Sequence, residues 1–128
     1  MNGLRVMVVD DSDITVKKIT QLFLGFGHDV VATCSSGKDV VKHYSELEPD
    51  LVTMDITMPE VDGIEATRQL IAQFPDAKII VITSHGQEQM VMEAISAGAQ
   101  GYVLKPIKAE KLKDTIDKIL SFEQGLLN

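Results

Sequence analysis

The sequence predicts an α/β fold, a doubly wound (βα)5 three-layer sandwich around a parallel five-stranded sheet. Five short apolar runs recur along the chain; they are rich in β-branched residues and do not alternate with polar ones. Such runs are typical of strands buried on both faces of a parallel sheet. A segment of helical length and period follows each run. Right-handed crossovers then place helices on both faces of the sheet.

The elements can be placed in order along the chain. Strands are expected at the apolar runs, at residues 6–9, 30–32, 51–54, 79–82 and 102–104. Helices are expected where apolar side chains recur every three or four residues, at 13–26, 37–47, 62–73, 87–97 and 109–122. Ser12 or Asp11 can cap the first helix. A residue that stops helices follows each one, in order Gly27, Pro49, Pro75, Gly98 and Gly125.

Composition narrows the class of protein. Residues 1–128 have the size of one domain, and we expect a single domain with a short tail at 123–128. The net charge of -7 and the pI of about 4.8 argue against a broad surface for nucleic acid. Cys34 is the only cysteine, which excludes an internal disulfide. The N-terminal apolar stretch is broken by Arg5 and is too short for a signal peptide or a membrane span, so a cytoplasmic protein is expected.

Polar or charged residues follow the apolar runs of four strands. They are Asp10 and Asp11 after the first strand, Asp55 after the third, Thr83 after the fourth and Lys105 after the fifth. In a parallel sheet these ends lie on one edge, and the strand order 2-1-3-4-5 places the first and third strands side by side at the topological switch point. Three carboxylates, a hydroxyl and an ammonium group are therefore expected to share one crevice.

Such a cluster of carboxylates needs cations nearby. Two carboxylates about 4 Å apart repel by roughly 4 kcal/mol at an effective dielectric of about 20. Lys105 supplies one positive charge, and a divalent cation can supply the rest. Oxygen ligands without histidine or cysteine suit Mg²⁺ or Mn²⁺ rather than zinc. Helix capping is the simpler alternative, but it accounts only for Asp11 or Ser12 and leaves Asp55 unexplained.

Four motifs carry a family resemblance. They are VVDDS at 8–12, MDITMPEVDG at 54–63, ITS at 82–84 and GYVLKP at 101–106. With these motifs the sequence resembles the receiver domains of two-component signalling, and most closely the stand-alone CheY-type chemotaxis response regulators. The resemblance covers essentially the whole chain and implies a flavodoxin-like, CheY-like fold with a cis peptide bond before Pro106. It also implies a phosphorylated switch rather than an enzyme.

The resemblance implies a Mg²⁺-dependent phosphorylation site. Asp55 resembles the phosphoacceptor, which attacks a phosphohistidine of a histidine kinase or a small acyl phosphate. Asp11 resembles a direct metal ligand, Asp10 a ligand that acts partly through water, and Thr57 the residue that lends its backbone carbonyl. Lys105 resembles the lysine that binds the phosphoryl group. Phosphoryl transfer requires mainly positioning and charge neutralisation, which agrees with these roles.

The resemblance also implies which residues convert phosphorylation into a signal. Thr83 resembles the hydroxyl that follows the phosphoryl oxygen, and Tyr102 the aromatic residue that fills the space it leaves. Thr57 and His85 lie at the two positions where members of the family vary the side chains next to the phosphoryl group, so a rate-tuning role is expected. His28, by contrast, is expected to be solvated.

The partner surface is expected on the face made by the fourth helix, the fifth strand and the fifth helix. Met90, Val91 and Met92 are consecutive and span about 200° around the fourth helix. A core-facing stripe is little wider than about 100°, so at least one of them must face solvent. Met90 or Val91, beside Tyr102, is the predicted anchor. Expected partners are a CheA-like sensor histidine kinase, a target such as the flagellar motor switch, and a phosphatase.

Two alternatives remain open from the sequence. Residues 11–15, DSDIT, match the D-x-D-x-T pattern of haloacid-dehalogenase-like phosphatases. That pattern leaves Asp55 unused, and it places Asp11 one position too far beyond the strand. The other alternative is a receiver fragment of a multidomain regulator with a transcriptional or other output. A stand-alone regulator is expected because the chain ends soon after the fifth helix.

Overall fold

The computed structural model describes residues 3–58 and 61–125. Its sheet has five parallel strands in the order β2-β1-β3-β4-β5, which confirms the predicted topology. The strands are β1 (Arg5–Val9), β2 (Asp29–Cys34), β3 (Leu51–Asp55), β4 (Ile79–Thr83) and β5 (Gly101–Leu104). The helices are α1 (Asp13–Gly25), a 3-10 turn η1 (Gly37–Asp39), α2 (Val40–Leu47), α3 (Gly63–Gln73), α4 (Glu88–Ala97) and α5 (Ala109–Gly125). No helix within the two described ranges is long and apolar enough to cross a membrane.

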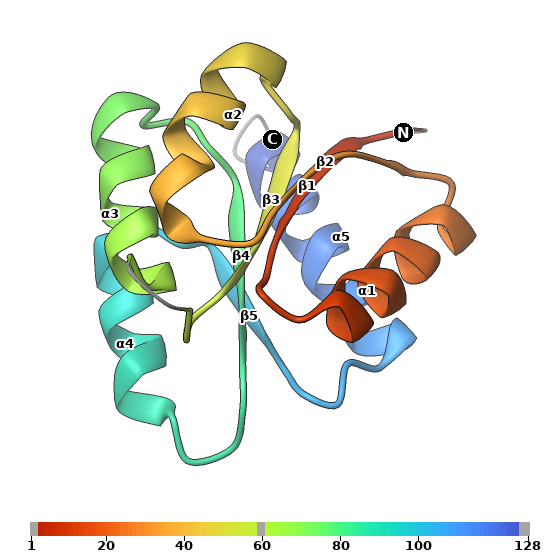
Figure 1. Ribbon diagram of the computed structural model, residues 1–128. Coiled ribbons are helices and arrows are strands. Elements are labelled where there is room, and N and C mark those ends of the chain that lie inside the picture. Colours follow the sequence, from red (N-terminus) through yellow and green to blue (C-terminus); the bar gives the residue numbers. More distant parts are fainter. Residues whose placement is uncertain (1–2, 59–60, 126–128) are drawn as a thin grey trace.

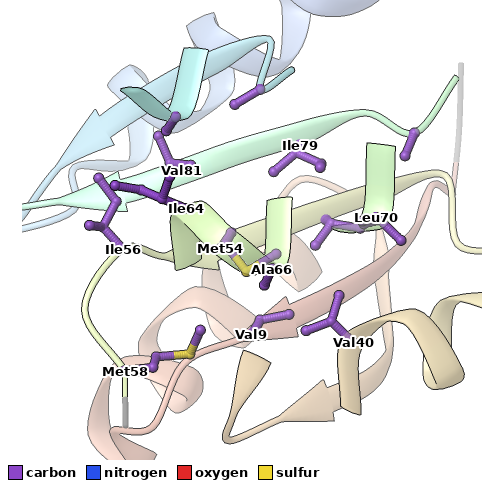
Figure 2. Packing of buried hydrophobic residues seen from close by; sticks show 14 of the residues in the cluster. Val9, Val40, Met54, Ile56, Met58, Ile64, Ala66, Leu70, Ile79 and Val81 are labelled. Carbon is purple, nitrogen blue, oxygen red and sulfur yellow. The ribbon is translucent and has the colours of Figure 1, made fainter. Parts of the chain in front are cut away.

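Helices cover both faces of the sheet, with α1 and α5 on one face and α2, α3 and α4 on the other (Figure 1). Successive strand residues point to opposite faces, so each face has its own apolar core. Val6 packs with α1 and α5, whereas its neighbour Met7 packs on the side of the other three helices. Figure 2 shows this second core, where Ala66 and Leu70 of α3 lie over the sheet. The two cores hold the strand ends in fixed positions.

The register of the strands aligns their carboxyl ends. Val9 of β1 pairs with Met54 of β3, which makes the next residues, Asp10 and Asp55, neighbours. Thr83 ends β4 one residue beyond the pairing partner of Asp55. The predicted gathering of polar side chains at one edge therefore follows directly from sheet register.

The helix boundaries differ from the predicted ones by more than one residue at two places. The helix expected at 37–47 begins with the 3-10 turn η1, and the Ser36 side chain caps this turn by accepting from the Lys38 N–H at 3.2 Å. The prediction of a tail at 123–128 is wrong for residues 123–125, because α5 continues to Gly125. No glycine or proline interrupts the helical segment before that residue. Residues 126–128 lie outside the described residues.

His28 is buried, which corrects the expectation that it is solvated. The chain turns from α1 towards β2 at Gly27, whose φ of 90° favours glycine. This turn places the His28 ring centroid 6.2 Å from that of Phe23 and 6.4 Å from that of Phe26. His28 Nδ1 accepts a hydrogen bond from the Leu4 N–H at 3.1 Å. The ring therefore connects the end of α1 to the start of β1.

Candidate functional site

Three aspartates come together where β1 and β3 end. Asp10 follows β1 and is 2% exposed, Asp55 ends β3 and is 6% exposed, and Asp11 is exposed at the rim. One carboxylate oxygen of each lies within 4.8 Å of those of the other two. The Ser12 N–H donates to Asp10 Oδ1 at 2.8 Å, whereas Asp10 Oδ2 has no hydrogen-bond partner among the described residues. The cluster therefore keeps at least one buried acceptor oxygen that the protein does not satisfy.

Burial and mutual repulsion disfavour negative charge in this cluster. Burial raises the pKa of Asp10 above its usual value. Burial first, and the Asp10 charge second, raise the pKa of Asp55 to about 6. Lys105 Nζ lies 3.6 Å from Asp55 Oδ1 and 3.8 Å from Asp10 Oδ2, distances typical of an ion pair but too long for a hydrogen bond. One lysine thus offsets only part of the charge, and a further cation would stabilise the cluster.

The cluster fits a hard divalent cation. Its three side chains offer only carboxylate oxygens, the ligands that Mg²⁺ prefers. Asp10 Oδ2 supports a cation here, because buried polar atoms in proteins otherwise have hydrogen-bond partners. Asp10, Asp11 and Asp55 are the side chains that would hold Mg²⁺, and they are the three that the sequence analysis named.

Backbone features bring the surrounding loops close to Asp55. Gly63 begins α3, and its N–H donates to the Ile56 carbonyl oxygen at 2.8 Å. A β-carbon at Gly63 would collide with the backbone carbonyl of Asp55, so any other residue would force α3 away from the end of β3. On the other side of the site, the Lys105–Pro106 peptide bond is cis, as predicted.

The hydroxyl of Thr83 is held by Gln87, a residue that the sequence analysis did not identify. Thr83 is 1% exposed, and its Oγ1 donates to Gln87 Oε1 at 2.7 Å. Gln87 is the N-cap residue of α4. That position was the available signal in the sequence, because N-caps are usually Ser, Thr, Asp or Asn. A glutamine at the start of a helix, four residues after a strand-end threonine, could have been singled out.

The other predicted site residues lie around the rim. The Thr57 N–H makes a long hydrogen bond of 3.4 Å to Asp55 Oδ1, and the Thr57 side chain is exposed. His85, Tyr102 and Lys105 line one groove of about 1120 Å³. About half of Tyr102 is exposed in this groove. The groove therefore connects the Lys105 side of the acidic cluster with the exposed surface of β5.

The expectation that Val91 offers exposed apolar surface is wrong. Val91 is 9% exposed and belongs to the core between α4 and the sheet, together with Ala94 one turn later. Met90 is partly buried and packs against the same core. Met92 is the one that faces solvent, with 67% exposure. One of the three residues is exposed, as the limited width of a core-facing stripe requires, but the core-facing pair Val91 and Ala94 orients α4 so that this residue is Met92.

The family model of the response regulator receiver domain matches residues 6–117. Chemotaxis protein CheY of Thermotoga maritima is 39% identical over 117 residues, covering 91% of this chain and 98% of that protein. Chemotaxis protein CheY of Bacillus subtilis is 40% identical over 117 residues, with coverage of 91% and 98%. A solved chain of the CheX-CheY-BeF3-Mg+2 complex from Borrelia burgdorferi is similar with a TM-score of 0.87 and 33% identity, covering 91% of this chain and 89% of that one. The chain therefore belongs to the family of response regulator receiver domains.

Proposed function

We propose that this receiver domain acts as a stand-alone chemotaxis switch, in which Asp55 accepts a phosphoryl group from a CheA-like sensor histidine kinase. The observation that carries this proposal is the meeting of Asp55 with Asp10, Asp11 and Lys105 at one sheet edge. Asp55 lies at the end of its strand, and with a pKa of about 6 it is mainly ionised at pH 7.5. An ionised carboxylate is the form that can attack phosphorus.

The proposed reaction is a transfer between two protein side chains. An oxygen of Asp55 forms a bond to phosphorus while the P–N bond of the phosphohistidine breaks, and the imidazole nitrogen keeps the electron pair. The Lys105 ammonium group offsets negative charge on the phosphoryl oxygens. When bound by Asp10, Asp11, Asp55 and the Thr57 carbonyl, Mg²⁺ would neutralise more of that charge; Mn²⁺ would suit the same ligands. The product is an aspartyl phosphate.

We expect the aspartyl phosphate to be lost slowly by self-hydrolysis. Thr57 and His85, the two predicted rate-tuning residues, carry neither a carboxamide nor a carboxylate that could orient an attacking water. The carboxamide of Gln87 lies nearby, but its oxygen accepts from the Ser84 N–H and its nitrogen donates to Thr57. A separate phosphatase is therefore a proposed partner.

The proposed target surface is the α4–β5–α5 face. Large apolar side chains are exposed on two of its elements: Met92 and Ile95 on α4, and Tyr102 and Leu104 on β5. The groove between β5 and α5 opens on the same side and reaches Lys105. Movement of the Thr83 loop after phosphorylation would alter this face first, because α4 directly follows that loop. A flagellar motor switch protein or another output protein is the proposed target.

Phosphorylation of the purified protein tests the proposal. Incubation with acetyl phosphate and Mg²⁺, or with a phosphorylated histidine kinase, should label Asp55 with a base-labile acyl phosphate. The Asp55→Asn variant should not be labelled, whereas Asp29→Asn at the opposite edge of the sheet should be labelled like the parent. Labelling that survives in Asp55→Asn but is lost in Asp11→Asn would contradict the proposal and favour the phosphatase alternative.

A further inference from the structure

Gln87 joins the two loops that flank the phosphorylation site. Its Oε1 accepts from the Thr83 hydroxyl at 2.7 Å and from the Ser84 N–H at 2.8 Å. Its Nε2 donates to Thr57 Oγ1 at 3.1 Å. Thr57 follows β3 and Thr83 ends β4, so a single carboxamide connects both loops to the start of α4. Gln87 therefore contacts the residue two positions after Asp55 as well as the strand-end hydroxyl of β4.

The contacts fix the direction of each hydrogen bond. A backbone N–H can only donate, so the Gln87 atom that faces Ser84 must be the carbonyl oxygen. That assignment places the amide NH₂ group towards Thr57. The Thr83 hydroxyl contacts the same carbonyl oxygen, which has no proton to give, so Thr83 must be the donor. The single hydroxyl proton of Thr83 therefore goes to Gln87, because the other acceptor in reach, the Ser84 carbonyl oxygen, lies at 3.5 Å, the long limit of a hydrogen bond.

This hydrogen bond competes with the proposed role of Thr83 in the switch. A hydroxyl has one proton, and it cannot donate to Gln87 and to a phosphoryl oxygen on Asp55 at the same time. Thr83 is almost completely buried, so water cannot readily replace Gln87 as its acceptor. The Thr83–Gln87 hydrogen bond must break before Thr83 can bind the phosphoryl group.

We propose that Gln87 is a positioning residue that holds Thr83 in the unphosphorylated arrangement. It thereby sets how readily the Thr83 hydroxyl moves to the phosphoryl group on Asp55. The proposal rests on the proposed function of Asp55 and Thr83. It also links the site to the target face: Gln87 occupies the N-cap position at the start of α4, and it loses its bond to Thr83 when that hydroxyl turns to the phosphoryl group. An intramolecular hydrogen bond of this kind shifts an equilibrium by roughly twofold to tenfold.

Beryllofluoride with Mg²⁺, a stand-in for the phosphoryl group, provides the binding test. Titrations followed by NMR should show that Gln87→Leu binds beryllofluoride about twofold to tenfold more tightly than the parent, because the competing acceptor is gone. In a Thr83→Val background the same substitution should change the affinity by less than about twofold, since no hydroxyl remains to be held. Gln87→Met, which has a similar length and likewise lacks the carboxamide, should behave like Gln87→Leu.

A second measurement uses the protein without metal or beryllofluoride. The methyl resonance of Thr83 should shift in Gln87→Leu and Gln87→Met but stay near the parent position in Gln87→Glu, which keeps an acceptor for the hydroxyl. Equal effects of Gln87→Leu on beryllofluoride affinity with and without the Thr83→Val change would overturn the proposal. An affinity that is unchanged or weaker in Gln87→Leu would also overturn it. Failure of the proposed function is distinct, because then the parent would not bind beryllofluoride at Asp55 at all.

Discussion

Polar side chains are hydrogen-bonded differently at the two edges of the sheet. The strands begin at the amino edge and end at the carboxyl edge. At the amino edge, Asp50 Oδ2 accepts from the Arg5 N–H at 2.8 Å. Gln100 Oε1 accepts from the Ile79 N–H at 2.7 Å, and Gln100 Nε2 donates to the Ala77 carbonyl oxygen at 3.0 Å. The buried histidine between α1 and β2 also uses a ring nitrogen to accept a backbone N–H. Side chains at this edge satisfy backbone groups that the strands leave unpaired.

At the carboxyl edge the acidic side chains are poorly satisfied. Asp10 Oδ2 is buried without a partner among the described residues, and Lys105 approaches Asp55 only to 3.6 Å. Burial raises the pKa of Asp10, and burial with the Asp10 charge raises that of Asp55 to about 6. Polar groups that serve stability are normally hydrogen-bonded, whereas perturbed pKa values gather at functional sites. The amino edge therefore has the polar contacts of a part that stabilises the fold, whereas the carboxyl edge has those expected of the proposed phosphorylation site.

The largest expected change in unfolding free energy comes from removing the negative charge of Asp55 at the carboxyl edge. Folding raises the pKa of Asp55 from 3.8 to about 6. The stability that the folded parent gains from protonated Asp55 is therefore fully present below pH 3.8. It is lost as the pH rises through about 6. Without divalent cations, Asp55→Asn should exceed the parent in unfolding free energy by roughly 3 kcal/mol at pH 7.5, with the difference shrinking towards pH 4.

Urea unfolding in the presence of a chelator, at several pH values, measures this difference. Addition of Mg²⁺ should reduce the advantage of the Asn variant at pH 7.5, because the parent offers three carboxylate ligands and the variant only two, so that the cation stabilises the parent more. A difference between the two proteins that stays constant from pH 4 to pH 7.5 would contradict the raised pKa.

A substitution at the amino edge should change the unfolding free energy in the opposite direction, by lowering it. His28→Leu keeps an apolar side chain near Phe23 but removes the acceptor of the Leu4 N–H, so the unfolding free energy should fall by about 1–3 kcal/mol. His43→Leu is the matched control, since the ring contact of His43 with the Asp39 carbonyl oxygen is exposed, and it should change stability by less than about 0.5 kcal/mol. Both variants should retain acetyl-phosphate labelling. Equal stability of the His28 variant and the parent would argue against a structural role for this edge.

Mg²⁺ should stabilise the protein through the carboxyl edge alone. A ligand that binds only the folded state adds about 1.4 kcal/mol at tenfold over its Kd. Thermal unfolding with millimolar Mg²⁺ should show this gain in the parent and lose it in Asp11→Ala. Asp50→Ala, at the amino edge, should be less stable than the parent but should keep the same gain. A melting temperature that does not respond to Mg²⁺ in the parent would be evidence against the metal site.

The smallest expected effect concerns a buried hydroxyl between the two edges. Thr53 Oγ1, in the middle of β3, has no hydrogen-bond partner among the described residues. Thr53→Val removes this unsatisfied group with little change in shape, so stability should rise by about 1 kcal/mol. Thr67→Val is the control, because the Thr67 hydroxyl donates to the Gly63 carbonyl oxygen at 2.7 Å, and its loss should not stabilise. Chemical unfolding of both variants decides whether hydrogen-bond satisfaction explains the difference.

Most of the fold could be predicted, because buried parallel strands and amphipathic helices have local patterns. Each expected strand is present, although β2 extends over Asp29–Cys34 rather than 30–32. The first turn of the second helix became 3-10, and the last helix continued through residues expected to form a tail. Boundaries of this kind depend on hydrogen bonds at helix ends, which apolar periodicity does not report.

The sequence alone determined which groups meet at the carboxyl edge. Asp10, Asp55, Thr83 and Lys105 each follow an apolar run, and parallel strands necessarily bring such residues to one edge. Only the tertiary structure decided how they are held. The Gln87–Thr57 and His28–Leu4 hydrogen bonds join residues 30 and 24 positions apart. The rotation of α4, which exposes Met92, depends on its packing against the sheet. Such contacts depend on how separate elements pack in space, and no local pattern of residues encodes that placement by itself.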